Sequence, residues 1–410
     1  MMKRVKKKAT PFYTIGLLAL GLLVVGCSVE EQATDAKEAN PIEVEPPIVL
    51  DCNYFSKNPD AVLRDNPNAP VDYVVTCHLN IENNVSIEPG VVIAFETDTG
   101  FWITREGSLQ AIGTTDKPIT FTGVDKKRGS WGGIFFATND PKNEMTHTII
   151  EYAGGKAISK ATNEVGGIVI GAQSSLRFTN NLVQHCKGWG VSLYYTTNEA
   201  QTIIETNTFK ENEKPLQLTM AYLGLLKGDN RFIDNSSNKV EVSSQLAISG
   251  TQTMSKLSVP YLVRGLFNFE VGKEGNLTIE KGTVIEMAAD KRIVVKGSLK
   301  AVGTADEKII IRGETAAAGS WGNIIYHNSS PNNQLKHVEI LHAGGNPKAY
   351  HLYRGAVALD KNSRLSLEDT HFEGIFSCVL YQQQPSVLTG GERITYNNVN
   401  QAGLEDCKTL

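Results

Sequence analysis

The chain contains the octapeptide GSLQAIGT at residues 107–114, and it repeats this stretch as GSLKAVGT at residues 297–304. The similarity extends outward from the octapeptide. Residues 107–155 align with residues 297–345 at a constant offset of 190 and without a gap, and 21 of the 49 positions are identical. Identity at this level indicates an internal duplication, so we expect a fold built from repeated units.

Each copy contains short segments that have the composition of β-strands. They are β-branched or aromatic, they alternate apolar with small or polar residues, and Gly, Asn, Asp or Pro separates them. In the first copy these segments are Val91–Phe95, Phe101–Thr104, Ile119–Thr122, Ile134–Ala137, Thr148–Tyr152, Ile168–Ile170 and Val191–Tyr195. After residue 26 the only helical pattern is a turn or two near Met220–Leu226. The chain is therefore predicted to be all-β.

Asparagine recurs two positions before an apolar residue at Asn181, Asn207, Asn230 and Asn397. The first three are separated by 26 and 23 residues. Asn tolerates the left-handed backbone conformation and bonds to its own backbone, so it suits a corner between strands. Stacked at this spacing, the Asn side chains are predicted to form a ladder along one edge of a solenoid, with each following apolar residue in the core.

A period of about two dozen residues, built from short strands and Asn or Gly corners, predicts a right-handed parallel β-helix. Each strand would pair with its equivalent in the next coil, about 4.8 Å away, and residues 81–400 would form about 13 coils. We expect an N-terminal cap at residues 48–80, a first half at residues 81–245 and a second half at residues 246–410. A β-propeller or an array of sandwiches is the alternative, but the sequence lacks the hairpin signals of propeller blades.

Further motifs follow the octapeptide in both copies. They are Pro118-Ile119-Thr120-Phe121 in the first copy and Lys308-Ile309-Ile310-Ile311 in the second, and each is followed by Ser-Trp-Gly. This order of motifs resembles the β-helix lipoproteins of the pectate-lyase-like superfamily in Bacteroidota. The resemblance covers most of the chain after Cys27 and implies the β-helix fold. Its motifs specify fold and carry no catalytic signature.

The N-terminus has the order of features found in a secretory signal. The first 26 residues contain five basic side chains and no acidic one, and Phe12–Val25 is an apolar run of 14 residues, which is short for a membrane span. The run ends in Val24-Val25-Gly26-Cys27, which resembles the bacterial lipobox. This resemblance implies that residues 1–26 are a signal peptide and that Cys27 carries lipid. Acyl chains contribute about 0.8 kcal/mol for each buried CH₂, so they would hold the protein on a membrane without a spanning helix.

Residues 27–47 are predicted to be an acidic, flexible tether. This stretch has six acidic residues against one Lys and no aromatic residue, so it cannot bury enough apolar surface to fold. The acidic residues close to Cys27 resemble the surface-export signals of Bacteroidota lipoproteins. We therefore expect a lipid-anchored protein of the bacterial outer membrane, which such a signal would expose at the cell surface.

The charge balance excludes a nucleic-acid binder. The 410 residues include 40 basic and 44 acidic side chains, and removal of residues 1–26 would leave 35 basic against 44 acidic, a net charge of −9. A nucleic-acid binder needs a basic face that displaces counterions from phosphates. Hydrophobic residues make up 41% of the chain, which is enough for a large core and excludes general disorder.

The remaining cysteines suggest two disulfides and no zinc site. Cys52 with Cys77 and Cys378 with Cys407 are the disulfide candidates, because the space beyond the inner membrane permits disulfides. Cys186 lies in an apolar register and is expected to be a buried thiol. The sequence has no Cys-x-x-Cys and no His-x-His, so we expect no metal and no cofactor.

Residues that are kept in both copies are expected to serve the coil geometry. Trp131 and Trp321 occupy equivalent positions, as do His147 and His337. We expect each Trp to pack against a turn and each His to cap a backbone carbonyl. Residues that differ between the copies are freer to serve a function.

The ligand-binding candidates are aromatic and basic residues, several of which have no counterpart in the other copy. Aromatic side chains stack on sugar rings, and Arg grips carboxylates through its planar fork. The candidates are Lys126, Lys127 and Arg128, which face three alanines at residues 316–318, together with Tyr194, Tyr195, His351, Tyr353 and Arg354. The pair Glu151-Tyr152 also differs from its counterpart, Leu341-His342. For each of them, a charged or aromatic side chain that only covers the core is the alternative.

The favoured function is a binding or adhesion scaffold for a polysaccharide or a surface protein. The main alternative is a polysaccharide lyase or glycoside hydrolase, and the second is a structural envelope protein. A hydrolase of this fold needs paired carboxylates, but the sequence has no Asp-Asp pair and only one Asn-x-Asp, at residues 58–60 in the expected cap. A lyase needs a base beside calcium, but the candidate bases at residues 125–128, 290–292 and 360–364 are not flanked by the carboxylates that calcium requires.

Overall fold

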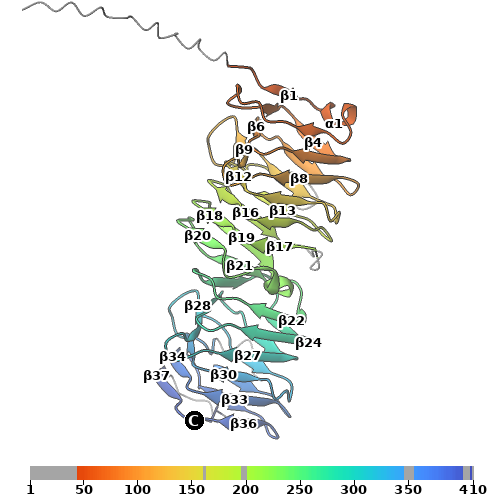
Figure 1. The fold of residues 1–410 in the computed structure, drawn as a ribbon. Helices are drawn as coiled ribbons and strands as arrows, with labels where there is room; N and C mark the ends of the chain where they lie inside the picture. Colours follow the sequence, from red (N-terminus) through yellow and green to blue (C-terminus); the bar gives the residue numbers. More distant parts are fainter. Residues whose placement is uncertain (1–43, 160–162, 195–200, 346–354, 400–406, 409–410) are drawn as a thin grey trace, which may run out of the picture. The chain divides into compact units, whose positions relative to one another are not determined.

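The computed structural model describes residues 44–159, 163–194, 201–345 and 355–399, and the backbone of residues 407–408 (Figure 1). This part of the chain contains one α-helix, α1 (Tyr54–Lys57), and one 3-10 helix, η1 (Met220–Leu225). Its other regular elements are strands. The predicted all-β class and the predicted helical turn near residue 220 are both confirmed. The expected signal peptide, Cys27 and most of the expected tether lie outside the described residues.

The first repeat winds through three sheets, which we name sheet A, sheet B and sheet C. Sheet A contains β1 (Ile48–Leu50), β3 (Tyr73–Val75), β6 (Val92–Phe95), β9 (Ile119–Gly123), β12 (Thr148–Glu151), β15 (Leu182–Gln184), β18 (Thr208–Lys210) and β20 (Arg231–Ile233). Sheet B contains β2 (Val62–Leu63), β5 (Asn84–Ile87), β8 (Ser108–Ile112), β11 (Glu144–Thr146), β14 (Arg177–Thr179) and β17 (Ile203–Glu205). Sheet C begins with β4 (His78–Ile81), β7 (Gly100–Ile103), β10 (Gly133–Phe136), β13 (Gly166–Ile170), β16 (Trp189–Leu193), β19 (Lys214–Thr219) and β21 (Val240–Ser243).

The second repeat extends sheet C and builds one further sheet, sheet D. Sheet C continues with β23 (Tyr261–Arg264), β25 (Val284–Met287), β28 (Ile309–Gly313), β31 (Val338–Leu341), β34 (His371–Ile375) and β37 (Thr395–Val399). Sheet D contains β22 (Ile248–Met254), β24 (Phe269–Ile279), β26 (Ile293–Val295), β27 (Ser298–Val302), β29 (Ile324–Tyr326), β30 (Gln334–Lys336), β32 (Val357–Leu359), β33 (Arg364–Glu368), β35 (Leu380–Gln382), β36 (Val387–Gly390) and β38 (Cys407–Lys408). Pairing in the described strands is parallel, except that β38 runs antiparallel to β35.

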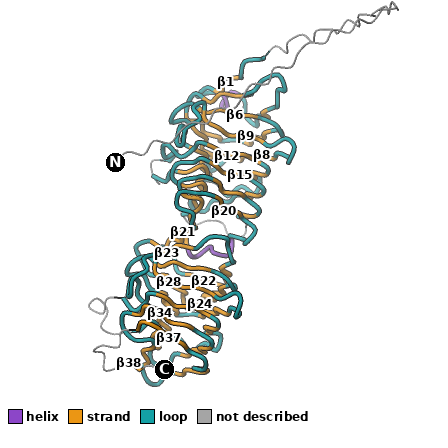
Figure 2. The backbone as a smooth tube through the Cα atoms, turned by 90° about the vertical axis from the view of Figure 1, so that its left-hand side faces the viewer, coloured by secondary structure: helices purple, strands orange, loops and turns teal. Residues whose placement is uncertain are grey.

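One coil passes from sheet C to sheet B, then to sheet A, and back to sheet C. β7, β8 and β9 form such a coil, and β10, β11 and β12 form the next one. Figure 2 shows these strands stacked coil upon coil. The architecture is a right-handed parallel β-helix, as the sequence predicts, and the seven strands expected in the first copy all occur within two residues of their expected bounds. The number of coils stays a prediction.

The two repeats use different sheets for equivalent strands. β9 and β28 are equivalent by the offset of 190, but β9 lies in sheet A and β28 lies in sheet C. Similarly, β10 lies in sheet C and its equivalent, β29, lies in sheet D. The change occurs where sheet A ends at β20, because the chain then passes from β21 through β22 straight back to sheet C at β23. Sheet C thus runs through both repeats, but each strand of the second repeat lies one sheet further around the coil than its equivalent in the first repeat. We call this the shift of the second repeat by one face.

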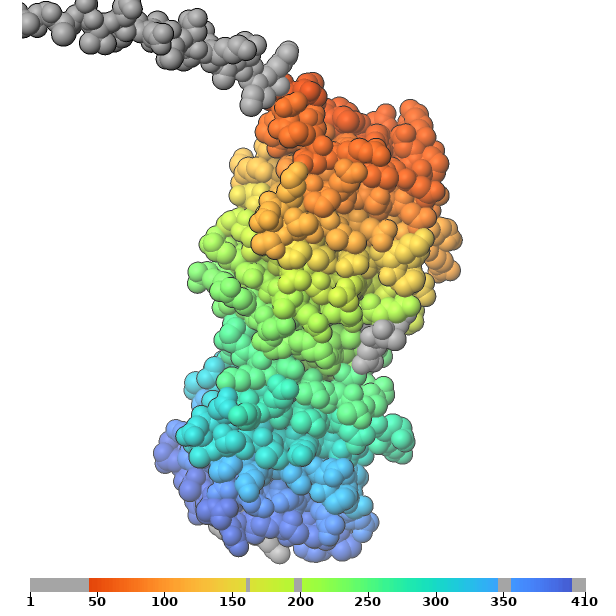
Figure 3. All heavy atoms as spheres, in the orientation of Figure 1, coloured from red at the N-terminus to blue at the C-terminus, as the bar shows by residue number. Residues whose placement is uncertain are grey.

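The inward side chains of the four sheets form one apolar core. Buried and less buried residues alternate along strands such as β3 and β5, as expected for strands with one face inside. Aromatic rings stack inside the core: the ring centroids lie 4.1 Å apart for Phe95 and Trp131, and 5.3 Å apart for Phe209 and Phe232. In Figure 3 the coils follow one another in sequence order and in close contact. Burial of this apolar surface is the main force that holds the coils together.

Single residues with a left-handed backbone form the corner between sheet B and sheet A. His147, Asn180 and Thr206 have φ angles of 50°, 57° and 56° at this corner. His337 is the counterpart of His147 in the second repeat and also has a φ of 50°. Nε2 of His337 lies 3.7 Å from Oδ2 of Asp369, and the expected carbonyl cap stays a prediction for His147 and His337. What the two copies share at this position is the backbone corner.

The predicted asparagine ladder directly follows this corner. Asn181, Asn207 and Asn230 are buried, and the side-chain oxygen of each later Asn accepts a hydrogen bond of 3.0 Å from the backbone N–H of the Asn one coil before it. Each side-chain amide also donates to a backbone carbonyl of a neighbouring coil. The apolar residue two positions after each Asn lies in the core, as predicted. The ladder satisfies buried backbone groups that the corners would otherwise leave without partners.

A second asparagine ladder, which the sequence pattern did not reveal, lies at the corner between sheet A and sheet C. The backbone N–H of Asn212 donates to the side-chain oxygen of Asn235 at 2.9 Å, and that of Cys186 donates to Asn212 at 3.0 Å. Cys186 is the next rung of this ladder, and it is a buried free thiol, as predicted. Asn397 was wrongly assigned to a ladder, because it is an exposed residue within β37.

The duplicated tryptophans occupy equivalent buried positions. Trp131 and Trp321 are both fully buried, and each indole N–H donates to a backbone carbonyl at 2.8 Å, that of Glu151 and that of Leu341 respectively. Both acceptors end a strand that leads into a corner. The expected packing of the tryptophans against a turn is confirmed.

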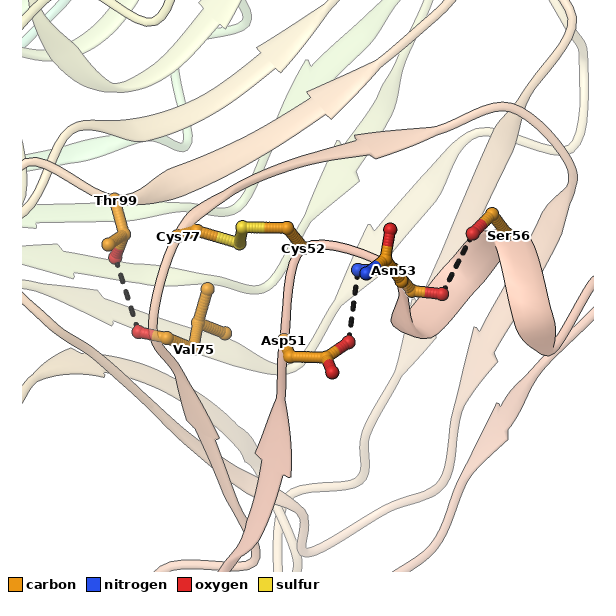
Figure 4. The surroundings of a disulfide bond; sticks show 7 residues. All are labelled: Asp51, Cys52, Asn53, Ser56, Val75, Cys77 and Thr99. Atoms are coloured by element: carbon orange, nitrogen blue, oxygen red, sulfur yellow. Dashed lines mark hydrogen bonds between the residues drawn. A yellow bond between two sulfur atoms is a disulfide. The ribbon is translucent and has the colours of Figure 1, made fainter.

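A disulfide joins Cys52 to Cys77, with the two Cα atoms 5.6 Å apart. It links the turn after β1 to the turn after β3 (Figure 4). Cys378 is also disulfide-bonded. The backbone of Cys407 pairs with Tyr381, but the side chain of Cys407 lies outside the described residues. The pairing of Cys378 with Cys407 therefore stays a prediction.

Candidate functional site

One column of outward-facing side chains runs along sheet C through the first repeat. Strand alternation turns these side chains away from the apolar core, and the pairing register places each one coil from the next. Asn80 is exposed and Trp102 is partly buried, whereas four members further along the column are buried: Phe135, Val169, Ser192 and Gln217. The column, which we name the sheet C face, consists of Asn80, Trp102, Phe135, Val169, Ser192, Gln217 and Glu241. Its members come from seven strands that span more than 160 residues of sequence, yet they form one continuous strip. The strip has an aromatic end near β7 and a polar end near β19.

The aromatic end of the sheet C face borders a pocket of about 470 Å³. Its lining residues are His78, Asn80, Asp98, Trp102, Lys156, Ala157, Ile158 and Ser159. The indole of Trp102 meets the rings of His78 and Phe135 edge-on, with centroid distances of 6.2 Å and 5.7 Å. Within the described residues, the buried Nε1 of Trp102 has no hydrogen-bond partner. The pocket therefore combines an aromatic ring with an unused donor.

Charged groups frame this pocket. Nζ of Lys156 lies 3.1 Å from Oδ2 of Asp98, and both side chains are more than half exposed. Burial lowers the pKa of His78, and the nearby Lys156 lowers it further. The imidazole is thus held in its neutral form, in which it offers one donor and one acceptor. Together with the amide of Asn80, the pocket presents both kinds of hydrogen-bonding group beside the indole.

The polar end of the sheet C face is a hydrogen-bonded cluster. Nε2 of Gln217 donates to Oε2 of Glu164 at 2.6 Å and to Oγ of Ser192 at 2.8 Å. Burial raises the pKa of Glu164, and the hydrogen bonds that Glu164 accepts from Gln217 and Ser192 offset the effect only in part. Burial also raises the pKa of Glu241, one coil further, although Lys214 lowers it. The cluster is therefore rich in acceptors.

The connection between β12 and β13 reaches both ends of the sheet C face. Its first part, residues 156–159, closes the Trp102 pocket, and near its end Glu164 joins the polar cluster. Residues 160–162 between them lie outside the described part of the chain. The equivalent connection of the second repeat contains three ligand-binding candidates, His351, Tyr353 and Arg354, which also lie outside the described residues.

A buried ion-pair group continues the column beyond Glu241. Glu286, whose side chain is only 7% exposed, lies 2.5 Å from Nζ of Lys239 and 2.7 Å from a guanidinium nitrogen of Arg312. Burial acts to raise the pKa of Glu286, but the hydrogen bonds and charges of its two cationic partners outweigh burial and hold the pKa below its usual value. This group is neutralised internally, so it differs from the acceptor-rich cluster next to it.

The predicted basic triplet lies at the corner between sheet A and sheet C. Nζ of Lys126 lies 3.5 Å from Oε1 of Glu151, and it also lies 5.6 Å from the ring centroid of Tyr152. The guanidinium of Arg128 donates to the backbone carbonyl of Glu211, in a coil far along the sequence. Two of the three basic side chains therefore tie coils together.

Two of the remaining candidates, Lys127 and Tyr194, lie within the described residues. Lys127, the third member of the basic triplet, is exposed, and Tyr194 follows β16 directly and is half-buried. Among the candidates that the structure describes, Tyr194 lies beside the sheet C face, since Ser192 of that face lies two residues before it. Tyr195 lies outside the described residues.

The sequence did not reveal the sheet C face. Trp102, Gln217 and Glu241 are far apart in the chain, and no motif connects them. The signal that was present is local: Trp102 is a large aromatic residue at an outward position of an alternating strand. It becomes informative only when the register of the neighbouring strands is known.

No group of three or more His, Cys, Asp or Glu side chains in the described part of the chain is arranged to hold a metal ion. Neither helix in the same residues has the length and apolar composition needed to cross a membrane.

Comparison with known proteins gives one match. Residues 65–176 match a family model described as a pectate-lyase like beta helix domain. No curated protein and no solved structure matches the chain. The matched residues carry the strands from β3 to β13, and together with the long parallel sheets they support assignment to the pectate-lyase-like β-helix superfamily.

Proposed function

We propose that this chain is a lipid-anchored β-helix protein of the bacterial outer membrane that binds polysaccharide at the aromatic end of the sheet C face. The observation that carries the proposal is the Trp102 pocket, in which an indole ring lies beside an amide, a neutral imidazole and an ion pair. Sugar rings have one apolar face and a rim of hydroxyl groups. The indole can stack on the apolar face of a sugar ring, and the donors and acceptors beside the indole can bind the hydroxyl groups at its rim.

The spacing of the sheet C face suits a polymeric ligand. Equivalent side chains recur at each coil, about 4.8 Å apart, so an extended chain can contact two coils in succession through the exposed Asn80 and the partly buried Trp102. Ser192 and Gln217 lie further along the same strip as Trp102, but they are 0% and 4% exposed, so a ligand does not reach them in this structure. Several weak contacts along one rigid sheet give useful affinity with little loss of protein entropy.

The anchor part of the proposal rests on the lipobox-like end of the apolar run at Cys27. The acidic stretch that follows would act as a flexible spacer between the lipid and the folded coils. This arrangement would place the β-helix outside the membrane, where polysaccharides of the envelope or of the surroundings can reach it.

The direct test is a glycan-array screen of the protein from Ser28 onward, with and without calcium, followed by calorimetry on the glycans that bind. Trp102→Ala should raise the Kd about 10-fold or more, as removal of a central aromatic anchor usually does. Trp102→Phe should retain most of the affinity. Phe267→Ala serves as the matched control, because Phe267 is an exposed aromatic residue of a loop outside the sheet C face, and it should leave the Kd unchanged.

The outcomes separate the proposal from its alternatives. Growing absorbance from unsaturated sugar products would favour a polysaccharide lyase, and new reducing ends without that absorbance would favour a hydrolase. If no glycan binds, or if Trp102→Ala binds as tightly as the native protein, the binding role is wrong and a structural envelope role gains support.

A further inference from the structure

The Trp102 pocket has an apolar wall, which the connection between β12 and β13 supplies. Ala157 and Ile158 of this connection line the pocket, and both are partly buried. Cδ1 of Ile158 occupies the space that a Cβ atom would need at Gly100 and at Gly132, so glycine at these two positions makes room for the side chain. The apolar wall is therefore held in place by packing against the coils beneath it.

The second repeat replaces the residues that form this pocket. The pairing register makes Val294 the counterpart of Trp102 and Arg292 the counterpart of Gly100. Valine supplies no aromatic ring, and the side chain of Arg292 stands where Gly100 leaves room for Ile158. Both repeats nevertheless form the same coils, so the coil geometry does not require the indole or the glycine.

The charges around the pocket cancel. Asp98 and Lys156 form an ion pair at its rim, the imidazole of His78 is neutral, and the other lining residues carry no charge. Both members of the ion pair are more than half exposed, so water screens their remaining field. The pocket therefore has no net charge with which to hold a carboxylate or an ammonium group.

Two polar groups of the pocket are available to a ligand. Asn80 is exposed, and within the described residues its side-chain amide makes no hydrogen bond. Nζ of Lys156 contacts Oδ2 of Asp98, and among the same residues no donor reaches the other carboxylate oxygen, Oδ1. The pocket thus offers an amide and a carboxylate oxygen beside an aromatic ring and an apolar wall.

We propose that the Trp102 pocket is a subsite for an N-acetylated amino sugar of the polysaccharide. The inference rests on the proposed binding of polysaccharide and names the class of sugar. An acetamido group is neutral, and its methyl group can pack against Ala157 and Ile158. Its N–H can donate to Oδ1 of Asp98, and its carbonyl can accept from the amide of Asn80. A sugar with a hydroxyl group in this place would leave the apolar wall without a partner.

The test compares chitotetraose with cellotetraose, two tetramers of the same linkage that differ in one substituent of each ring, acetamido in the first and hydroxyl in the second. The native protein should bind chitotetraose about 10-fold more tightly, which is the effect of one hydrogen bond to a charged group. Asp98→Gly should remove most of this preference, because it takes away the acceptor of the N–H. Glycine also suits the left-handed backbone of this residue, whose φ is 61°. Asp98→Asn keeps a weaker acceptor and should retain part of the preference.

The second repeat offers a matched control for this variant. Asp290 lies four residues before Val294, as Asp98 lies four residues before Trp102, and its φ is 60°. Asp290→Gly therefore makes the same change at an equivalent corner that has no indole beside it. This variant should keep the full preference for chitotetraose.

The results distinguish this inference from the proposed function. Equal or tighter binding of cellotetraose, still weakened by Trp102→Ala, would overturn the N-acetyl subsite and leave sugar binding at the pocket in place. A preference that survives in Asp98→Gly, or that Asp290→Gly also removes, would overturn the subsite as well. Array binding confined to glycans without an acetamido group would have the same meaning. If neither tetramer nor any arrayed glycan binds, the proposed function itself is wrong.

Discussion

Replacing Asn207 by Ala should destabilise the first repeat severely. The Asn207 side chain is fully buried, accepts from the backbone N–H of Asn181 at 3.0 Å and donates to the backbone carbonyl of Phe178 at 2.9 Å. Alanine would leave both backbone groups buried without these partners. Each such group costs about 1–3 kcal/mol, so the free energy of unfolding should fall by about 4 kcal/mol.

Two further variants sharpen this prediction. Asn397→Ala is the matched control, because Asn397 is exposed in β37, and the free energy of unfolding should change by less than about 0.5 kcal/mol. Asn207→Asp keeps the acceptor but buries a carboxylate, whose pKa should rise. Only the protonated acid can donate to the carbonyl of Phe178, so this variant should regain stability as the pH falls through that raised pKa.

The assay is urea unfolding followed by circular dichroism, combined with hydrogen exchange at the backbone amide of Asn181. Hydrogen exchange is needed because coils of a solenoid can open locally before the whole chain unfolds. The reasoning would be refuted by an Asn207→Ala midpoint equal to that of the native protein, or by unchanged protection of the Asn181 amide.

Three further outcomes follow from the structure. Replacing Cys52 and Cys77 by Ser opens a loop with a sequence separation of 25 residues and should cost about 3 kcal/mol in urea unfolding; no change in midpoint would contradict the disulfide. The pKa of Glu286 is lower in the folded protein than in the unfolded chain, so its ion pairs stabilise the fold at pH values above the unfolded pKa, and this stability is lost as the pH falls through the folded pKa. Glu286→Gln should therefore flatten the acid limb of a curve of unfolding free energy against pH. An unaltered curve would count against the buried ion pairs. Trp131→Phe and Trp321→Phe each remove one 2.8 Å hydrogen bond, and each should lower the free energy of unfolding by about 1–3 kcal/mol. Thermal unfolding of the two single variants and the double variant should give additive losses if the two sites are independent, and a non-additive loss would contradict this.

The fold was predictable because its determinants are local. A strand ends where Asn or Gly permits a sharp corner, and these residues recur at the spacing of a coil. The duplication also identified Trp131 and Trp321 as structural, because two copies of one residue mark what both copies need. Asn397 shows the limit of the pattern: an Asn two positions before an apolar residue occurs in a strand as well as after a corner, and the backbone angle of the preceding residue decides which.

The candidate site was not predictable, because it depends on register. Gln217 and Glu241 become neighbours only when β19 pairs with β21, and the length of each corner sets that pairing. Glu164 reaches them from a long connection whose path no local rule defines. The shift of the second repeat by one face was hidden for the same reason, since the two copies read alike in sequence and differ only in the sheet that receives each strand.

That shift decides how many equivalent faces a single polymer can touch at once. Had the duplicated coils stacked in one frame, the counterparts of Trp102 and its neighbours would lie further along the same strip, and one long ligand would gain avidity by spanning both. Instead the counterparts of β7, β10 and β13 turn to sheet D. The duplication has therefore lengthened the β-helix without placing a second copy of the sheet C face further along the same sheet.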